Sequence, residues 1–558
     1  MIAAPAHALK MITRCRRTTA LWLAILFLYL PIFTQAKENS PKVALTKFKS
    51  PLVEIFYFDD SDILLGLDPE NGKAYRSDNA GGDWKVVDQD GQKDIWTISP
   101  HPWDRTRAYL IGRNHDHWMT DDQGKSWRKF ETDATPNHFR PSLSFHGRDH
   151  KKALFEGQKC KGWECRSTTY YTDDDFKTMH PLRDGALGCY WAVSTPLFGV
   201  GIEPVVEKRI FCIVRGQFSP WTTGNRMLVS DDYFKSETEA MLAGSRAVSG
   251  IINMAPVKKY LVAAAKAEGT DELALYVTDD SSQWHRAEFG HHKVLEEAYT
   301  ILESTNYSMQ VDVMSEGGMG TLFTSNSNGT YFTRNIEHTN RGRHGYVDFE
   351  KVTGIQGIVM VNVVDNWEKV EKHAELKRVI SQISFDDGRT FQDLKADKDR
   401  LQLHSVTDPS NAGKVFSSPA PGIVMGVGNT GDRLKDYNDG HLYVSDDAGL
   451  TWKKAIDGPH KYEFGDQGAV IMAIGDSGAT DEIQYSLNHG KTWKKADLGE
   501  KVVPKLLMTV PDSTSLKFLL QAVKGDDWFI IVIDFEGLHE RKCGEKDFEK
   551  WAARLDKD

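Results

Sequence analysis

The sequence predicts an all-β protein, a ten-bladed β-propeller whose blades are marked by a recurring turn. Its clearest copy is Ser445–Trp452, of the form Ser-x-Asp-x-Gly-x-Thr-Trp. The Ser and Asp side chains can bond backbone amides of the turn, Gly449 tolerates a left-handed conformation, and Trp452 brings a large ring to bury. Eight weaker copies recur at intervals of 41 to 61 residues, the size of a four-stranded blade.

We call this stretch the Asp-box turn. Its nine copies start at Ser77, Thr120, Thr172, Ser230, Thr278, Ser325, Ser384, Ser445 and Ser486. Three copies, from Thr172 to Thr278, are eroded, and the Ser325 copy keeps only the Ser, the Gly and the closing aromatic. The acidic position drifts to Asn79, Ser327 and Asn488, which a repeated catalytic acid would not tolerate. The turns are therefore interpreted as scaffold.

Ring closure is predicted from the pieces that carry no Asp-box turn. The strand-like run 52–58 and the apolar runs 517–520 and 529–533 are expected to form a tenth blade together, with the first strand pairing with the last ones. Closure of this kind removes exposed sheet edges. The propeller is assigned to residues 51–538, and so large a ring should surround a wide tunnel.

The amino terminus has the pattern of a secretory signal peptide at residues 1–36. Four basic residues precede the apolar run 18–33, and Ala36 offers a small residue for cleavage. A retained signal anchor is less favoured, because the run is shorter than the ~20 residues that a spanning helix needs. Residues 37–50 are polar and expected to be a flexible lead-in. No later stretch is predicted to span a bilayer, so the chain is placed in the secretory lumen or outside the cell.

Composition and motifs limit the chemistry. A net charge of −10 argues against nucleic acid as a partner. The phosphate-loop pattern ending at Gly124 fails, because Met119 occupies a position that needs glycine. His115 and His117 could begin a metal site but lack a nearby third ligand. We expect no cofactor and no catalysis. A secreted Asp-box glycosidase stays open as an alternative, since scattered carboxylates could pair in space.

Cysteine usage fits an oxidising compartment. The sequence-local pairings are Cys160 with Cys165 and Cys189 with Cys212, although spacing alone leaves other connectivities open. Cys543 is then left over. Two triplets that begin at Asn306 and Asn328 are glycosylation acceptors in a secreted chain.

Several stretches outside the turns resemble the sortilin family, and most closely the fungal vacuolar protein sorting receptors that carry carboxypeptidase Y. These stretches are 189–198, 299–308, 328–334 with 345–350, and 533–543. The resemblance implies a ten-bladed propeller that binds peptide C-termini of soluble vacuolar hydrolases, between the late Golgi and a prevacuolar endosome. Full-length relatives are single-pass membrane proteins. Residues 539–558 would then begin a truncated cysteine-rich module, with Cys543 as its first cysteine.

The resemblance also implies a ligand site in the tunnel. Arg334 would pair with a ligand carboxylate, and Phe323, Ser325 and Ile336 would line the site. The alternative is that Arg334 bridges blades or points to solvent. His338 and His344 follow closely, so acidification could weaken binding. A chain without a membrane span would be a receptor fragment or a secreted soluble cargo binder.

Overall fold

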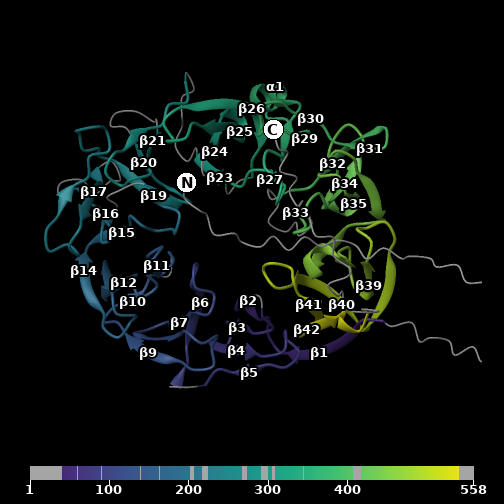
Figure 1. The fold of residues 1–558 in the computed structure, drawn as a ribbon, viewed down its shortest axis with the longest axis horizontal. Coiled ribbons are helices and arrows are strands. Elements are labelled where there is room, and N and C mark those ends of the chain that lie inside the picture. Colours follow the sequence, from purple (N-terminus) through teal and green to yellow (C-terminus); the bar gives the residue numbers. More distant parts are fainter. Residues whose placement is uncertain are drawn as a thin grey trace, which may run out of the picture.

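Strands arranged in a ring make up most of this computed structural model (Figure 1). The structure describes residues 40–59, 61–88, 91–137, 140–162, 164–201, 206–216, 224–266, 273–290, 299–304, 308–342, 345–405 and 416–538. The predicted signal peptide, the predicted cysteine-rich module, Asn306 and Cys543 lie outside these residues. None of the helices in the described part is long and apolar enough to cross a membrane.

The first half of the described chain forms five separate antiparallel sheets. Four of them have four strands each. The first two contain β2 (Val53–Tyr57), β3 (Leu64–Asp68), β4 (Lys73–Ser77) and β5 (Lys85–Val86), and then β6 (Ile95–Pro100), β7 (Ala108–Gly112), β8 (Asp116–Thr120) and β9 (Arg128–Glu131). The other two contain β15 (Ala186–Trp191), β16 (Ile210–Val214), β17 (Arg226–Ser230) and β18 (Thr238–Glu239), and then β19 (Ile251–Val257), β20 (Tyr260–Lys266), β21 (Leu273–Thr278) and β22 (His285–Arg286). The fifth holds β10 (Thr135–Pro136), β11 (Leu143–Phe145), β12 (Ala153–Lys161), β13 (Glu164–Thr172) and β14 (His180–Asp184).

The second half forms three larger sheets. An eight-stranded sheet contains β23 (Tyr299–Ser304), β24 (Met309–Met314), β25 (Met319–Ser325), β26 (Phe332–Asn340), β27 (Phe349–Lys351), β28 (Val359–Val364), β29 (Val379–Ser384) and β30 (Gln392–Asp393). A six-stranded sheet contains β31 (Lys395–Ala396), β32 (Asp399–Leu403), β33 (Phe416–Ser417), β34 (Val424–Thr430), β35 (His441–Ser445) and β36 (Lys453–Ile456). A seven-stranded sheet contains β37 (His460–Gly465), β38 (Val470–Gly475), β39 (Thr480–Ser486), β40 (Lys494–Met508), β41 (Lys517–Lys524), β42 (Asp527–Asp534) and β1 (Lys42–Phe48).

Helical segments in the described chain are short. They are the α-helix α1 (Trp367–His373) and the 3₁₀ turns η3 (Glu316–Gly318), η4 (Tyr437–Asp439), η5 (Asp466–Gly468) and η6 (Glu536–Leu538). The all-β class predicted from the turn repeats is thus confirmed. The eight-stranded sheet contains two Asp-box turns, so the number of hydrogen-bonded sheets is not the number of blades. The count of ten blades stays a prediction.

The Asp-box turns are held by bonds within a few residues of sequence. In the Ser445 copy, the Gly449 amide donates to the Ser445 hydroxyl at 2.8 Å and the Thr451 amide donates to Asp447 Oδ1 at 2.8 Å. The Trp452 indole donates to the Gly449 carbonyl at 3.0 Å. Ala448 and Gly449 both have left-handed backbone, with φ of 64° and 92°. The eroded copies at Thr172 and Ser230 keep the amide-to-hydroxyl bond.

The copy at Ser325 is a different turn. Its hydroxyl accepts the Met309 amide and donates to the Asn326 carbonyl, both at 2.8 Å, in place of the turn amides. Ser327 occupies the acidic position and lacks the carboxylate that collects amides. Asn326 takes that role one residue earlier and accepts the Thr330 amide at 2.9 Å. The predicted sixth Asp box is therefore a turn in the expected place with another bonding pattern.

The strands that close the ring differ from two of the predictions. Strand β1 lies within the segment 37–50 that we expected to be flexible, and it pairs with β42 from Lys42 opposite Asp534 to Phe48 opposite Trp528. The run 52–58 does not close the ring, because β2 pairs with β3 instead. The many lysines and other polar residues of segment 37–50 hid the strand, although β1 places Val43 and Phe48 against apolar clusters. Figure 1 shows β1 and β42 beside β2–β5, so the two ends of the ring meet there.

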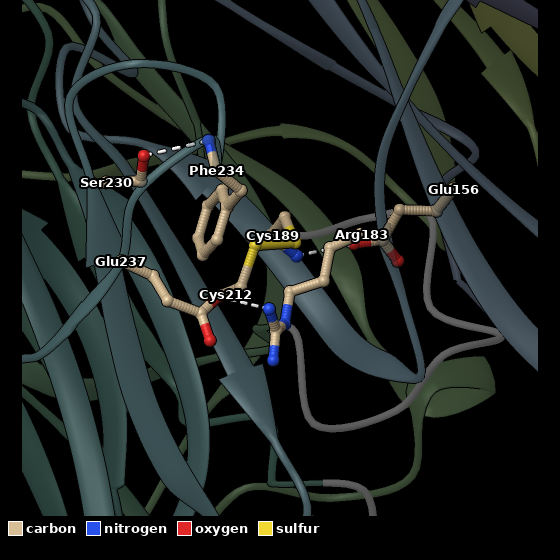
Figure 2. The surroundings of a disulfide bond; sticks show 7 residues. All are labelled: Glu156, Arg183, Cys189, Cys212, Ser230, Phe234 and Glu237. Atoms are coloured by element: carbon tan, nitrogen blue, oxygen red, sulfur yellow. Dashed lines mark hydrogen bonds and ion pairs between the residues drawn. A yellow bond between two sulfur atoms is a disulfide. The ribbon is translucent and has the colours of Figure 1, made fainter.

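The disulfides follow the sequence-local pairing. Cys160 bonds Cys165 across the β12–β13 hairpin, and Cys189 bonds Cys212 between β15 and β16. The second disulfide is buried, with both cysteines at most 1% exposed. The Phe234 ring points toward it, and the Cys189 amide donates to Glu156 of the preceding sheet at 2.8 Å (Figure 2). This disulfide therefore sits at a junction between two sheets.

Candidate functional site

The predicted ligand hairpin is formed by β25 and β26. Arg334 lies directly opposite Phe323 in the strand register, and Ile336 lies opposite Leu322. The Arg334 side chain is 53% exposed, and its guanidinium forms an ion pair with Glu337 on the same strand. Of the alternatives drawn from sequence, the described contacts match a guanidinium that faces solvent.

The side chains of the other three predicted site residues contact neighbouring parts of the protein. Phe323 is 1% exposed and its ring packs edge-on against Phe289, with centroids 5.1 Å apart. Ser325 is buried with its hydroxyl bonded to backbone. Ile336 packs on the cluster formed by Val361, Val363 and Ile380. The hairpin thus brings the four residues together, but only Arg334 offers a polar group to a ligand.

The position of β26 is unusual for the described strands. It pairs with β25 along its length and meets β28 at Thr339 opposite Val363, so it joins two halves of the eight-stranded sheet. In Figure 1, β26 lies at the outer side of the ring and β23 lies nearer the centre, so the strand that carries Arg334 is not the one nearest the tunnel, where the site was expected. A ligand reaching Arg334 would contact this junction.

A buried ion pair fixes the far end of the hairpin. The Arg341 guanidinium bonds the Asp312 carboxylate, and both side chains are at most 3% exposed. Arg341 Nη2 also donates to the Thr300 hydroxyl at 3.0 Å, and the Thr339 hydroxyl donates to Asp312. These bonds satisfy both buried charges and link β24 to the residue that follows β26.

His338 packs against α1 next to the proposed site. Its ring stacks on Trp367 of α1 with centroids 4.2 Å apart. Burial lowers the pKa of His338, while Glu337 and Glu371 act in the opposite direction. His344 lies outside the described residues. The hypothesis of acid-triggered release through His338 would therefore need a pH below the usual histidine range.

The other sequence candidates are structural. His117 is fully buried, accepts the Gly112 amide at 3.2 Å through Nδ1, and contacts the Thr132 hydroxyl at 3.0 Å through Nε2. His115 Nδ1 contacts the Thr132 carbonyl at 2.9 Å. Within the described ranges, no three His, Cys, Asp or Glu side chains are grouped to hold a metal ion. Asn328 sits in the β25–β26 turn, where its side chain accepts the Thr330 amide at 3.2 Å.

Sequence reasoning missed a cavity of about 770 Å³ among the sheets that precede the hairpin in the chain. We call it the inner pocket. Its walls include Trp103, Arg140, Leu143, Tyr190, Leu197 and Lys258. These residues come from four sheets and share no motif, so no local signal could have grouped them.

These features together define a β-propeller protein built on Asp-box turns, with a half-exposed arginine at a sheet junction and a separate apolar cavity. A family model described as "Sortilin, neurotensin receptor 3" matches residues 72–507, and its C-terminal companion matches residues 509–558. The chain belongs to the sortilin/Vps10 family.

Curated relatives agree with this assignment. The chain is 56% identical over 538 residues to the vacuolar protein sorting/targeting protein 10 of Ajellomyces capsulatus (strain G186AR), covering 94% of this chain and 36% of that protein. It is 57% identical over 542 residues to the protein of that name from Paracoccidioides lutzii, with the same coverage. The chain thus spans about a third of the length of these relatives. They are named as sorting proteins and not as enzymes, which disfavours the glycosidase alternative.

Solved structures match the chain only weakly. The Niastella koreensis GH74 enzyme matches with a TM-score of 0.33 and 11% identity, covering 85% of this chain and 84% of that one. The WD40 domain of SCAP from fission yeast matches with a TM-score of 0.34 and 9% identity, covering 91% and 97%. Likenesses this weak carry no argument about function.

Proposed function

We propose that this chain is the cargo-binding part of a vacuolar sorting receptor, with soluble hydrolases of the carboxypeptidase Y type as cargo. The observation that carries the proposal is the 56% identity to vacuolar sorting/targeting proteins over 94% of the chain. The predicted signal peptide and the two disulfides support work in the secretory lumen, between the late Golgi and a prevacuolar endosome.

We further propose that Arg334 binds a carboxylate at the C-terminus of the cargo. A guanidinium offers two parallel donors that match a carboxylate. The present partner, Glu337, is 42% exposed, and an exposed pair of this kind contributes only about 0–1 kcal/mol. A cargo carboxylate could therefore replace Glu337 at little cost.

The test measures binding of purified carboxypeptidase Y precursor to the immobilised secreted chain. Arg334→Ala should weaken binding about tenfold, because one charge-assisted contact is worth roughly 1.5–3 kcal/mol. Arg378→Ala is the matched control, since Arg378 is also half-exposed and paired with an acid, Asp365. If the unchanged chain binds the precursor and Arg334→Ala binds it equally well, the proposed site is refuted. If the unchanged chain does not bind the precursor, the proposed cargo is refuted.

A further inference from the structure

We infer that the inner pocket is a second cargo subsite, which takes an extended peptide segment carrying a bulky apolar side chain next to an acidic one. This inference rests on the proposed cargo-binding function and extends it to a different part of the ring. Its evidence is the placement, the apolar walls and the charges of the pocket.

The pocket is built from strands near the start of consecutive sheets and from the segments that follow them. Leu143 lies on β11 and Tyr190 on β15, while Trp103 follows β6 and Lys258 follows β19. In Figure 1, β6, β11, β15 and β19 all lie on the inner side of the ring. A ligand that fills the cavity therefore contacts four sheets in succession. A volume of about 770 Å³ falls in the range of pockets that enclose ligands of several hundred daltons.

The walls of the pocket are unusually apolar for an accessible surface. Trp103 and Leu197 are 40% and 44% exposed, although both are large hydrophobic side chains. Three prolines, at positions 141, 196 and 256, add rigid walls without amide donors. Burial of a large apolar side chain removes it from water, so an aromatic or leucine side chain of a ligand would gain by entering.

The charges of the pocket select the polar part of the ligand. Arg140 and Lys258 are its cations, and Glu156 is its only carboxylate among the described lining residues. The Glu156 carboxylate already accepts the Cys189 amide across the sheet junction (Figure 2). Gly188 leaves room for Arg140, since an added Cβ would lie 2.9 Å from Arg140 Nη1. The net positive charge favours an acidic side chain.

The polar groups at the floor of the pocket are fixed before a ligand enters. The Tyr190 hydroxyl donates to Asn253 Oδ1 at 3.0 Å, which ties β15 to β19. The Thr195 hydroxyl donates to the Lys258 carbonyl, which ties the segment after β15 to the turn after β19. A pocket whose walls are held by bonds between sheets binds without paying to order them.

The experiment uses the secreted full chain and a fluorescein-labelled heptapeptide, capped at both ends, with Leu-Phe-Glu at its centre. Fluorescence anisotropy should show saturable binding. Replacing the peptide Phe by Ala, or its Glu by Gln, should weaken binding at least tenfold. On the protein, Trp103→Ala and Arg140→Gln should each do the same, with an unchanged melting temperature because both side chains are exposed.

Two control variants separate this subsite from other effects. Trp96→Ala removes another exposed tryptophan that does not line the pocket, and Arg334→Ala removes the other proposed site; neither should change peptide binding. No saturable binding, or binding that Trp103→Ala and Arg140→Gln leave unchanged, would overturn the inference. A peptide that ends in a free carboxylate after Leu-Phe is compared with the capped peptide. Tighter binding of the free-ended peptide would also overturn the inference, because the pocket would then select a C-terminus and not an acidic side chain.

Carboxypeptidase Y precursor is measured on the same variants. Peptide binding without precursor binding would leave the subsite standing and refute the proposed cargo. Precursor binding without peptide binding would refute the subsite alone.

Discussion

An Asp-box turn of the Ser445 type concentrates its bonding on two side chains. A hydroxyl accepts an amide four residues on and donates to the carboxylate, and the carboxylate accepts a further amide, as at Ser445 and Asp447. The glycine of the turn also packs on the preceding sheet. A Cβ on Gly449 would lie 2.7 Å from Ile383, and one on Gly490 would lie 3.1 Å from Val444. The turn therefore fixes both a hairpin and the spacing between sheets.

Gly449→Ala should be more damaging than a glycine change at an open turn. The left-handed backbone costs about 1 kcal/mol for alanine, and the contact with Ile383 adds roughly 1–3 kcal/mol. Gly458→Ala is the matched control, because Gly458 has a φ of 83° and open space around it. Chemical denaturation measures both. Equal losses of stability would show that the packing contact contributes nothing.

The two disulfides should differ in their access to reductant. Cys160 and Cys165 are exposed on a hairpin, whereas Cys189 and Cys212 are buried under the Phe234 ring. Millimolar dithiothreitol applied to the native chain, followed by alkylation and mass spectrometry, should label the first pair early. The second pair should be labelled only after denaturation, because a thiolate must reach a sulfur atom to exchange. Labelling of both pairs at one rate would contradict the buried junction.

At the scale of elements, β1 links the two ends of the chain that form the ring. It covers the edge of β42 over seven residue pairs, and the Thr46 hydroxyl donates to the Gly82 carbonyl in the first Asp-box turn at 2.7 Å. Lys47 adds an ion pair with Asp527 at 2.6 Å. A short strand thus covers a sheet edge and touches the next sheet at the same time.

A chain that starts at residue 50 should be less stable and should self-associate, compared with one that starts at residue 40. Loss of β1 exposes the edge of β42 and the apolar side chains beneath Val43. We expect a drop of several kcal/mol in unfolding free energy, on the order of the burial of a few apolar side chains. Thermal melting and size-exclusion chromatography check this. A truncated chain that is monomeric and equally stable would contradict the role of β1.

At the scale of the whole molecule, histidines are buried at several points around the ring. Burial lowers the pKa of His117 to about 3 and that of His101 to about 4. For His101, the nearby His150 acts in the same direction and Asp104 in the opposite one. The unfolded chain binds protons at these histidines near pH 6.5, and the folded chain does not. Acidification therefore favours unfolding.

The melting temperature should fall as the pH is lowered from 7 to 5. The stability that these histidines contribute is complete above about pH 6.5 and is lost progressively below it, by on the order of 2 kcal/mol for His117 at pH 5. His117→Asn keeps an acceptor for the Gly112 amide and should lower stability at pH 7 while making the pH dependence shallower. An identical pH slope in the variant would contradict this assignment.

The features that could be predicted from the sequence alone are those held by short-range bonds. The Asp-box turns at Ser445 and Ser230 form because each bond joins residues at most a few positions apart. The sequence-local disulfide pairing was one of several open connectivities until the structure showed it. The tertiary structure decided the pairing of β1 with β42, the altered turn at Ser325, and the burial of Phe323. It also assembled the inner pocket from Trp103 to Lys258. These features depend on contacts between residues far apart in the chain, and the ring must close before those residues meet.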